Sequence, residues 1–256
     1  MPTRTSYRSG TFCWVDLSTP DPEAAKAFYA ELFGWSCDRH PIARLEGEAV
    51  AAIVEQDAAE SGRGVPPHWN NYVSVEDADA SVARAGELGA TILGDAFDIA
   101  DEGRIGVVID PTGAALCMWQ PRSHIGAGIV NAPGALTWNE LGTADVEAAT
   151  GFYTALFGWQ TQSVTPDGGY RIVKLGERSN GSIRQQGPEE REGGAPPFWM
   201  PYFVAADSVD VTATTAGELG GAAMLGPLDL PNGGRIAALA DPQGAVFGVL
   251  EGELDD

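Results

Sequence analysis

Cysteine is scarce in this chain, and its distribution argues against a disulfide-bonded fold. All three cysteines lie in the first half of the sequence. This pattern favours a reducing compartment, so we expect a cytoplasmic protein. Long apolar runs are missing too, because none approaches the roughly 18 residues of a membrane span. Residues 1–10 also lack the apolar stretch of a secretory signal, so we expect neither a signal peptide nor a membrane span.

Cationic residues are few as well. The chain has 15 Lys and Arg residues against 36 Asp and Glu residues, which gives a formal net charge of −21 at pH 7. Binding to nucleic acid or to an anionic membrane surface needs clustered Lys and Arg. We therefore expect no nucleic acid and no membrane among its partners. A large net charge is typical of a surface that keeps a protein dispersed in solution.

The common catalytic motifs are also missing. The sequence has no G-x-S-x-G, no P-loop, no Cys-x-x-Cys and no G-x-G-x-x-G after a predicted strand. The three histidines are His40 in a polar loop, His68 just before a predicted strand and His124 in a predicted linker. We expect these histidines to be surface or capping residues.

What the chain does contain is an internal repeat. WVDLSTPDPEAAKAFYAELFGW, from Trp14, aligns without a gap with WNELGTADVEAATGFYTALFGW, from Trp138, and 13 of the 22 positions are identical. Four further blocks follow in the same order in both halves: PP-x-W at Pro66 and Pro196, AGELG at Ala85 and Ala216, GRI at Gly103 and Gly234, and DP-x-GA at Asp110 and Asp241. A repeat of this kind predicts two similar domains. We place them at residues 1–125 and 135–256, with a Gly- and Pro-containing linker at 126–134.

Each half is predicted to contain two βαβββ units. Residues 11–17 form the first predicted strand, which places Phe12, Trp14 and Asp16 on one face. A capping aspartate, an apolar face and a terminal glycine then mark a helix in each copy, from Asp21 to Gly34 and from Asp145 to Gly158. A second helix between further strands completes each half. This order predicts an α+β fold with mixed sheets.

These motifs resemble those of the vicinal oxygen chelate superfamily. The resemblance rests on FYxxLFGW after a short strand, a V-x-D junction between strand and helix, and GRI followed by DPxGA before a final strand, and it covers residues 12–250. The superfamily includes glyoxalase I, bleomycin-resistance proteins and extradiol dioxygenases. The paired form is most similar to an actinobacterial two-domain branch labelled glyoxalase-like or hydroxylase. The resemblance implies that tandem βαβββ units form two similar cup-shaped domains, with the ligand inside the cup.

The resemblance also implies where a metal ion would be held. Metal-dependent members place Glu, His or Gln on the first strand of each unit and on the last strand. In this chain those positions fall on Trp14 and Trp138, on Asn70 and Met200, and on Cys117 and Gly248. Only Cys117 among them is an ordinary metal ligand. We therefore expect no metal site and no cofactor.

Two carboxylates lie beside the substituted ligand positions. Asp16 and Glu140 follow the tryptophans by two residues and so share their strand face. If that face lines the cup, an acid in apolar surroundings has a raised pKa and can exchange a proton, which makes both residues catalytic candidates. The alternative is that an arginine of a GRI block, Arg104 or Arg235, holds each carboxylate in an ion pair.

Aromatic residues on the predicted strands indicate a flat ligand. Because Trp14 and Trp138 replace metal ligands that face the cup, they are expected to form an aromatic floor for a flat, partly apolar guest such as an aromatic metabolite. The other predicted ligand-binding residues are Asn70, Tyr72, Cys117, Trp119, Met200 and Tyr202. Asn70 is replaced by Met200 and Cys117 by Gly248 in the second copy, so we expect the two cups to be inequivalent and favour the first.

Three functional hypotheses follow. The first is a metal-free binding protein that holds a flat, partly apolar small molecule for sequestration or tailoring. The second is a divalent-metal-dependent glyoxalase, dioxygenase or hydroxylase-type enzyme with an unorthodox ligand set, such as Asp16 or Glu140 with Cys117. The third is a protein that acts through partner contacts and has filled cups. The sequence leaves open whether a reaction is catalysed, and a monomer or a homodimer is expected because the fused halves already supply a pseudo-twofold pair.

Overall fold

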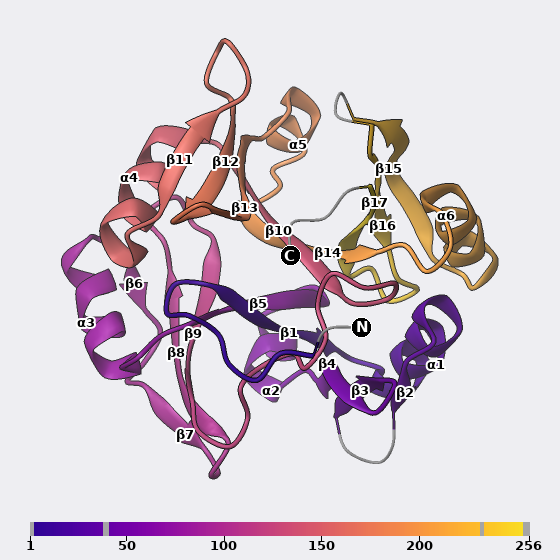
Figure 1. Cartoon of the computed structure of the whole chain (residues 1–256), viewed down its shortest axis with the longest axis horizontal. Helices are drawn as coiled ribbons and strands as arrows, with labels where there is room; N and C mark the ends of the chain where they lie inside the picture. Colours follow the sequence, from indigo (N-terminus) through magenta and orange to yellow (C-terminus); the bar gives the residue numbers. More distant parts are fainter. Residues whose placement is uncertain (1–2, 38–40, 231–232, 253–256) are drawn as a thin grey trace.

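The computed structural model describes residues 3–37, 41–230 and 233–252, and it contains two mixed β-sheets with helices packed against them (Figure 1). This confirms the predicted α+β class. In the described part of the chain, no helix is long and apolar enough to cross a membrane.

The first sheet has nine strands in the order β2-β3-β4-β1-β5-β9-β8-β6, with β7 paired to β8. Its strands are β1 (Phe12–Thr19), β2 (Ser36–Cys37), β3 (Ile42–Leu45), β4 (Glu48–Glu55), β5 (His68–Ser74), β6 (Thr91–Ile92), β7 (Phe97–Ile99), β8 (Gly103–Ile109) and β9 (Ala115–Pro121). The helices of this half are α1 (Pro22–Phe33), α2 (Ala58–Gly62) and α3 (Ala78–Glu87). The first strands of its two units, β1 and β5, pair at the centre.

The second sheet repeats this plan with eight strands in the order β11-β12-β13-β10-β14-β17-β16-β15. Its strands are β10 (Leu136–Thr143), β11 (Gln160–Ser163), β12 (Tyr170–Leu175), β13 (Arg178–Gln185), β14 (Phe198–Val204), β15 (Ala222–Asp229), β16 (Arg235–Ala240) and β17 (Val246–Glu251). Its helices are α4 (Val146–Phe157), α5 (Pro188–Glu192) and α6 (Val209–Glu218). In the first half, β1 pairs in parallel with β4, the last strand of its unit, and antiparallel with β5, the first strand of the next unit. In the second half, β10 pairs with β13 and β14 in the same way.

The predicted helix signals are confirmed. Asp21 caps α1 by accepting a hydrogen bond from the Ala24 amide at 3.1 Å, and Asp145 caps α4 in the same way. Gly34 ends α1 with a φ of 73°, a left-handed conformation that glycine adopts without a Cβ clash. Local chemistry is therefore enough to fix the ends of these helices.

One predicted strand face is wrong. The register of β1 against β5 shifts between Phe12 and Trp14, as at a β-bulge. Phe12 consequently packs in the core beside Trp159 and Trp199, whereas Trp14 joins a different buried cluster. A bulge adds one residue to a strand and so turns the following side chains to the other face.

The two hydrophobic cores are each built from both halves. One contains α1 with α6, and the other contains α3 with α4, so these helix pairs lie side by side at opposite ends of the molecule (Figure 1). The hydroxyl of Tyr29 on α1 donates to Asp241 at 3.2 Å, in the β16–β17 turn of the other half. The hydroxyl of Tyr153 on α4 donates to Asp110 at 2.8 Å in the equivalent turn of the first half.

The segment predicted as a linker is packed against the fold. Ala127, Ile129 and Ala132 are buried, and the Ala127 amide donates to the Cys13 carbonyl at 2.8 Å. The strands before and after this segment belong to different sheets, whereas each hydrophobic core contains residues from both halves. The domain limits at residues 125 and 135 therefore stay a prediction.

Candidate functional site

The candidate site of the first half is centred on Asp16, where β1 meets β5. The β1–β5 register sets Asp16 opposite Asn70, and Trp14 opposite Tyr72. The Asp16 carboxylate is buried, and it accepts a hydrogen bond from Asn70 Nδ2 at 2.9 Å and another from the Tyr72 hydroxyl. Two side chains of one neighbouring strand therefore hold both carboxylate oxygens.

Burial decides the acid–base properties of this group. Removal from water raises the pKa of Asp16, and the hydrogen bonds from Asn70 and Tyr72 only partly oppose that effect. Burial, reinforced by the nearby Asp16 carboxylate, also raises the pKa of Tyr72 well above its ordinary value. No ion pair to Asp16 is found among the described residues. The site is thus a carboxyl group that favours keeping a proton, next to a tyrosine that keeps its own.

Tyr72, which binds this carboxyl group, belongs to a buried cluster with further aromatic residues, here called the aromatic wall. Trp14, Tyr72, Cys117 and Trp119 share one buried cluster. The rings of Tyr72 and Trp119 meet edge to face, with centroids 6.4 Å apart and an interplanar angle of 80°. Edge-to-face packing favours a fixed arrangement of these rings. The structure therefore brings together the predicted residues of the first cup.

His124 completes the wall and was not predicted as part of it. After β9 the chain turns back, so that the His124 ring stands edge-on to Trp14 with centroids 4.6 Å apart, while Trp119 Nε1 donates to the His124 carbonyl at 2.9 Å. Burial lowers the pKa of this histidine. Its Nε2 atom is buried and has no hydrogen-bond partner in the part of the chain that the structure describes. His124 was expected to be a surface or capping residue, but its side chain is half-buried and its Nε2 atom is buried. The turn of the chain after β9 places it there, and no local sequence pattern indicates that turn.

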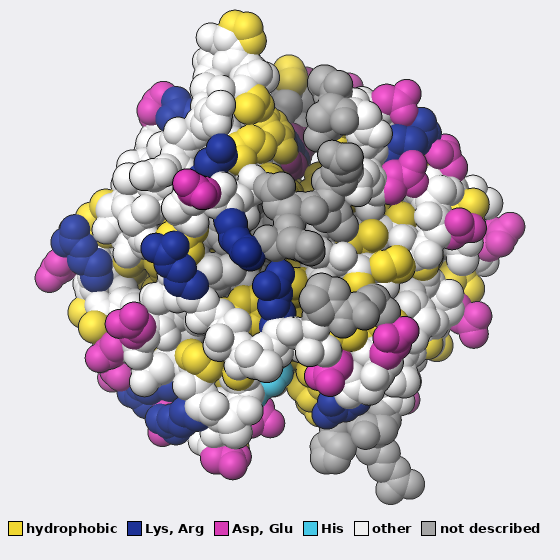
Figure 2. Space-filling model, in the orientation of Figure 1, with side chains coloured by type: hydrophobic (Ala, Val, Ile, Leu, Met, Phe, Trp, Pro, Cys, Tyr) yellow, Lys and Arg dark blue, Asp and Glu magenta, His cyan; other side chains and the backbone are white. Residues whose placement is uncertain are grey.

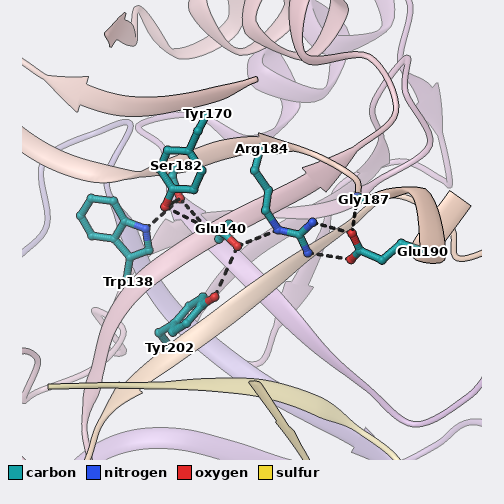
Figure 3. Close-up of polar contacts among 8 residues, drawn as sticks. All are labelled: Trp138, Glu140, Tyr170, Ser182, Arg184, Gly187, Glu190 and Tyr202. Atoms are coloured by element: carbon teal, nitrogen blue, oxygen red, sulfur yellow. Dashed lines mark hydrogen bonds and ion pairs between the residues drawn. The ribbon is translucent and has the colours of Figure 1, made fainter. Parts of the chain in front are cut away.

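The second cup holds its acid in a different way (Figure 3). Glu140 is buried and accepts hydrogen bonds from Arg184 Nε at 2.9 Å and from the hydroxyls of Tyr170 at 2.9 Å and Ser182 at 3.1 Å. Tyr202 also points its hydroxyl at Glu140, at 3.3 Å. Four donors, one of them cationic, therefore satisfy this carboxylate.

Arg184 also forms an ion pair with a second, more exposed acid. Its two terminal nitrogens bind both carboxylate oxygens of Glu190 on α5, at 2.6 and 2.7 Å. Glu190 also accepts from the Gly187 amide at 2.7 Å. The group Glu140–Arg184–Glu190 fills the polar end of the second cup, and Trp138 contacts it by donating from Nε1 to Ser182 at 2.9 Å (Figure 3). Met200 and Tyr202 pack with Trp138 in one cluster.

The ion pairs expected from the GRI blocks are wrong. Arg104 pairs with Asp79 and Asp98, and Arg235 pairs with Asp210 and Asp229, all on exposed surface. The cation beside Glu140 comes from β13 instead, where Arg184 stands opposite Gly142 in the parallel ladder. In the first sheet the equivalent partners are Val54 and Ser18. Arg184 in place of Val54 and Ser182 in place of Ala52, on the strand next to the acid, therefore distinguish the two cups.

The residues at the superfamily's metal positions do not fit a divalent metal ion. Burial raises the pKa of Cys117 well above its ordinary value, which disfavours the thiolate that a metal needs. A Cβ added at Gly248 would meet the Tyr202 ring at 2.1 Å, so that ring occupies the corresponding place in the second cup. Within the described ranges, no three His, Cys, Asp or Glu residues are grouped so as to hold a metal ion.

Comparison with known proteins agrees with the fold and the repeat. A family model described as a glyoxalase-like domain matches residues 14–119, and one described as bleomycin resistance protein-like N-terminal matches residues 135–176. The chain belongs to the glyoxalase-like and bleomycin-resistance-like family of the vicinal oxygen chelate superfamily, which confirms the resemblance seen in the sequence.

Relatives are found along the whole length. CFP32 of Mycobacterium tuberculosis, named provisionally as a glyoxylase, is 44% identical over 98% of both chains. The anthracycline biosynthesis protein DnrV of Streptomyces peucetius is 32% identical over 96% of this chain and 95% of its own. The Mn(II)-bound glyoxalase of Novosphingobium aromaticivorans superimposes with a TM-score of 0.67 at 15% identity, over 95% of this chain and 82% of that one. The 2,3-dioxygenase LapB of Pseudomonas sp. KL28 gives 0.64 at 15% identity, over 96% and 93% of the two chains.

Proposed function

We propose that this chain binds a flat, partly apolar small molecule in its first cup and does so without a metal ion. The observation that supports this most directly is the buried Asp16 carboxyl group, which is hydrogen-bonded to Tyr72 of the cluster that contains Trp14 and Trp119 and forms no ion pair among the described residues. Apolar walls with a few oriented polar groups are typical of small-molecule sites.

Two polar atoms of the cup have capacity for a ligand. A protonated Asp16 carboxyl can donate to a carbonyl or accept from a hydroxyl. His124 Nε2 lacks a partner among the described residues, and a buried unsatisfied polar atom costs about 1–3 kcal/mol unless a ligand or water satisfies it. A guest with a polar substituent on its rim would meet both needs, while its ring system packs on Trp14 and Trp119.

The second cup is the weaker candidate. Glu140 is already satisfied by Arg184, Tyr170 and Ser182, so a ligand would have to displace these donors. The predicted binding residues of this cup, Trp138, Met200 and Tyr202, pack together around that network. We therefore propose that the second cup supports the fold.

The names of the relatives are compatible with this ligand class. Two of them, DnrV and DauV, are named for anthracycline biosynthesis, and an anthracycline carries a flat polycyclic aromatic ring system. The shared chemistry is a flat ring system with polar substituents, which is the guest that the first cup suits.

Titration of the full chain with a panel of polycyclic aromatic compounds tests the proposal. Binding is measured by isothermal calorimetry on Asp16→Asn and on the matched variant Glu140→Gln, with intrinsic Trp fluorescence as a second readout. We expect Asp16→Asn to weaken binding about tenfold, the effect of losing one or two ligand hydrogen bonds, and Glu140→Gln to leave it unchanged. No binding by any member of the panel would refute the proposal.

The second candidate is a divalent-metal-dependent enzyme of the glyoxalase, dioxygenase or hydroxylase type. The names of CFP32 and of the Mn(II)-bound glyoxalase favour it, although the donor set found in the described ranges does not fit a metal ion. Elemental analysis of protein purified without added metal decides between the two. Stoichiometric Zn, Fe, Ni or Mn, with activity that a chelator abolishes and the metal restores, would replace the first proposal by this one.

A further inference from the structure

We propose a second ligand site, separate from both acids, that binds a small organic anion. A cavity of about 520 Å³ lies between residues 4–12, residues 130–139 and the β12–β13 turn at 175–180. Its lining includes neither Asp16 nor Glu140, and it touches the cups only through Tyr7 and Val130 on one side and Trp138 on the other. The volume is in the range of sites for small ligands.

Three arginines converge on this cavity. Arg4, Arg8 and Arg178 all line it, and within the described ranges none of the three forms an ion pair or a side-chain hydrogen bond. Elsewhere in this chain of net charge −21, Arg104, Arg171, Arg184 and Arg235 are held by carboxylates. Arginine binds carboxylates and phosphates with paired hydrogen bonds, so three unpaired guanidinium groups favour an anionic guest.

The charge gathers on one face. Figure 2 shows dark blue Lys and Arg side chains near the middle of the view, while the acidic side chains lie mainly toward its rim. The N-terminal segment crosses the same region in Figure 1. Glu177 is the one acidic residue in the described lining of the cavity, and it is exposed. Three cations against one carboxylate leave a net positive site on an acidic protein, which would attract anions.

Beside the charged residues, the lining is partly polar and partly apolar. Phe12, Val130, Leu136, Leu175 and Trp138 line the cavity beside the arginines. A bare inorganic anion would leave this surface exposed to water. The lining therefore suits a carboxylate or phosphate attached to an apolar or aromatic body, with the body against the apolar residues and the anionic group among the arginines.

The walls are fixed without a ligand. The Arg4 amide donates to the Gly128 carbonyl at 2.8 Å, and the Tyr7 hydroxyl donates to the Ala127 carbonyl at 2.6 Å. On the other wall, Asn180 Nδ2 donates to the Gly10 carbonyl at 2.9 Å. These contacts tie the N-terminal segment to both other segments, so the cavity is preorganised and only the arginine side chains need to be ordered on binding.

Calorimetry with three naphthyl probes tests this site. The probes are 1-naphthyl phosphate, 1-naphthoate and the neutral 1-naphthylmethanol, titrated into the full chain at low salt. We expect the anions to bind at this site at least about tenfold more tightly than the neutral probe, since it lacks the charge-assisted hydrogen bonds. Binding of any probe that Asp16→Asn weakens belongs to the first cup. The two anions distinguish a phosphate ligand from a carboxylate ligand by their relative affinity.

A pair of charge-matched variants assigns the site. Arg8→Gln with Arg178→Gln removes two cations from the cavity, and Arg63→Gln with Arg191→Gln removes two exposed cations elsewhere. We expect the first variant to lose anion binding about tenfold or more and the second to keep it. Absence of anion binding by the wild type, or equal loss in both double variants, overturns this site and leaves the proposal for the first cup untouched.

Discussion

Asp16 and Glu140 occupy the same position in the two copies and yet have opposite electrostatic surroundings. Asp16 has an asparagine and a tyrosine as donors, whereas Glu140 has an arginine, a serine and two tyrosines. The difference comes from the neighbouring strand, where Val54 in one copy stands at the position of Arg184 in the other. Substitutions on the strand beside the acid therefore contribute to the difference between a carboxyl group with a raised pKa and an acid held in an ion pair.

Asp16 should make the protein less stable as the pH rises. Its pKa is raised in the folded state by burial, so its contribution to stability is full below the unfolded pKa and is lost as the pH rises through the folded pKa. An asparagine side chain at this position does not titrate and has no such dependence. We therefore expect the unfolding free energy of Asp16→Asn, minus that of the wild type, to increase as the pH rises above the ordinary pKa of an aspartate, about 4. Urea unfolding at a series of pH values measures this, and a flat or falling difference would contradict it.

Arg184 should matter for stability rather than for binding. Replacing it by valine, the residue of the first copy, leaves Glu140 buried without its cation, and we expect a loss of about 3 kcal/mol, as for a broken buried ion pair. Urea midpoints at neutral pH give the value. The double variant Arg184→Val with Glu140→Gln is the control and should recover most of the loss. If the single variant were as stable as the wild type, the ion pair would not stabilise the fold.

Only part of the candidate site follows from the sequence. The strand alternation and the repeat place Trp14, Asp16, Tyr72 and Trp119 where the structure brings them together. Arg184 and Tyr170 reach Glu140 from strands far along the chain, and their partners depend on sheet pairing that no local pattern encodes. The roles of the predicted residues in binding or catalysis stay predictions.

At the scale of elements, the helices and turns were the most predictable features. Capping aspartates and terminal glycines fix the helix ends because they act within one turn of the chain. The face of β1 was predictable only after Phe12, since the bulge depends on pairing with β5. The shared cores were not predictable, because nothing in an amphipathic helix tells which sheet its apolar face will cover.

The Asp-Pro-x-Gly turn at Asp110 should contribute strongly to the unfolding free energy. Asp110 Oδ1 accepts from the amides of Thr112, Gly113 and Ala114, while Oδ2 accepts from Tyr153 of the other half. We expect Asp110→Ala to lower the unfolding free energy by about 2–4 kcal/mol, because it leaves several buried donors unsatisfied. Thermal or urea unfolding measures it, with Thr112→Ser as a conservative control. A loss no larger than that of the control would contradict the prediction.

For the whole molecule, the shared cores mean that the halves depend on each other. Each core combines helices from both copies, and each Tyr–Asp hydrogen bond joins one copy to the other. We expect the full chain to unfold in a single cooperative transition and the separate fragments 1–134 and 135–256 to lack a cooperative transition, since each would expose half of two cores. Circular dichroism during urea unfolding tests this. Two transitions in the full chain, or a stably folded fragment, would show that the halves are independent.

The fusion of the two copies has a further consequence for how their differences arise. In a homodimer of identical chains, the same sequence encodes both cups, so every substitution appears in each of them. In this chain each cup is encoded by its own part of the sequence, so β13 can carry an arginine beside Glu140 while β4 carries a valine beside Asp16. Ligand preference can therefore be altered by mutagenesis of the first cup alone, while the second copy continues to hold the shared cores together.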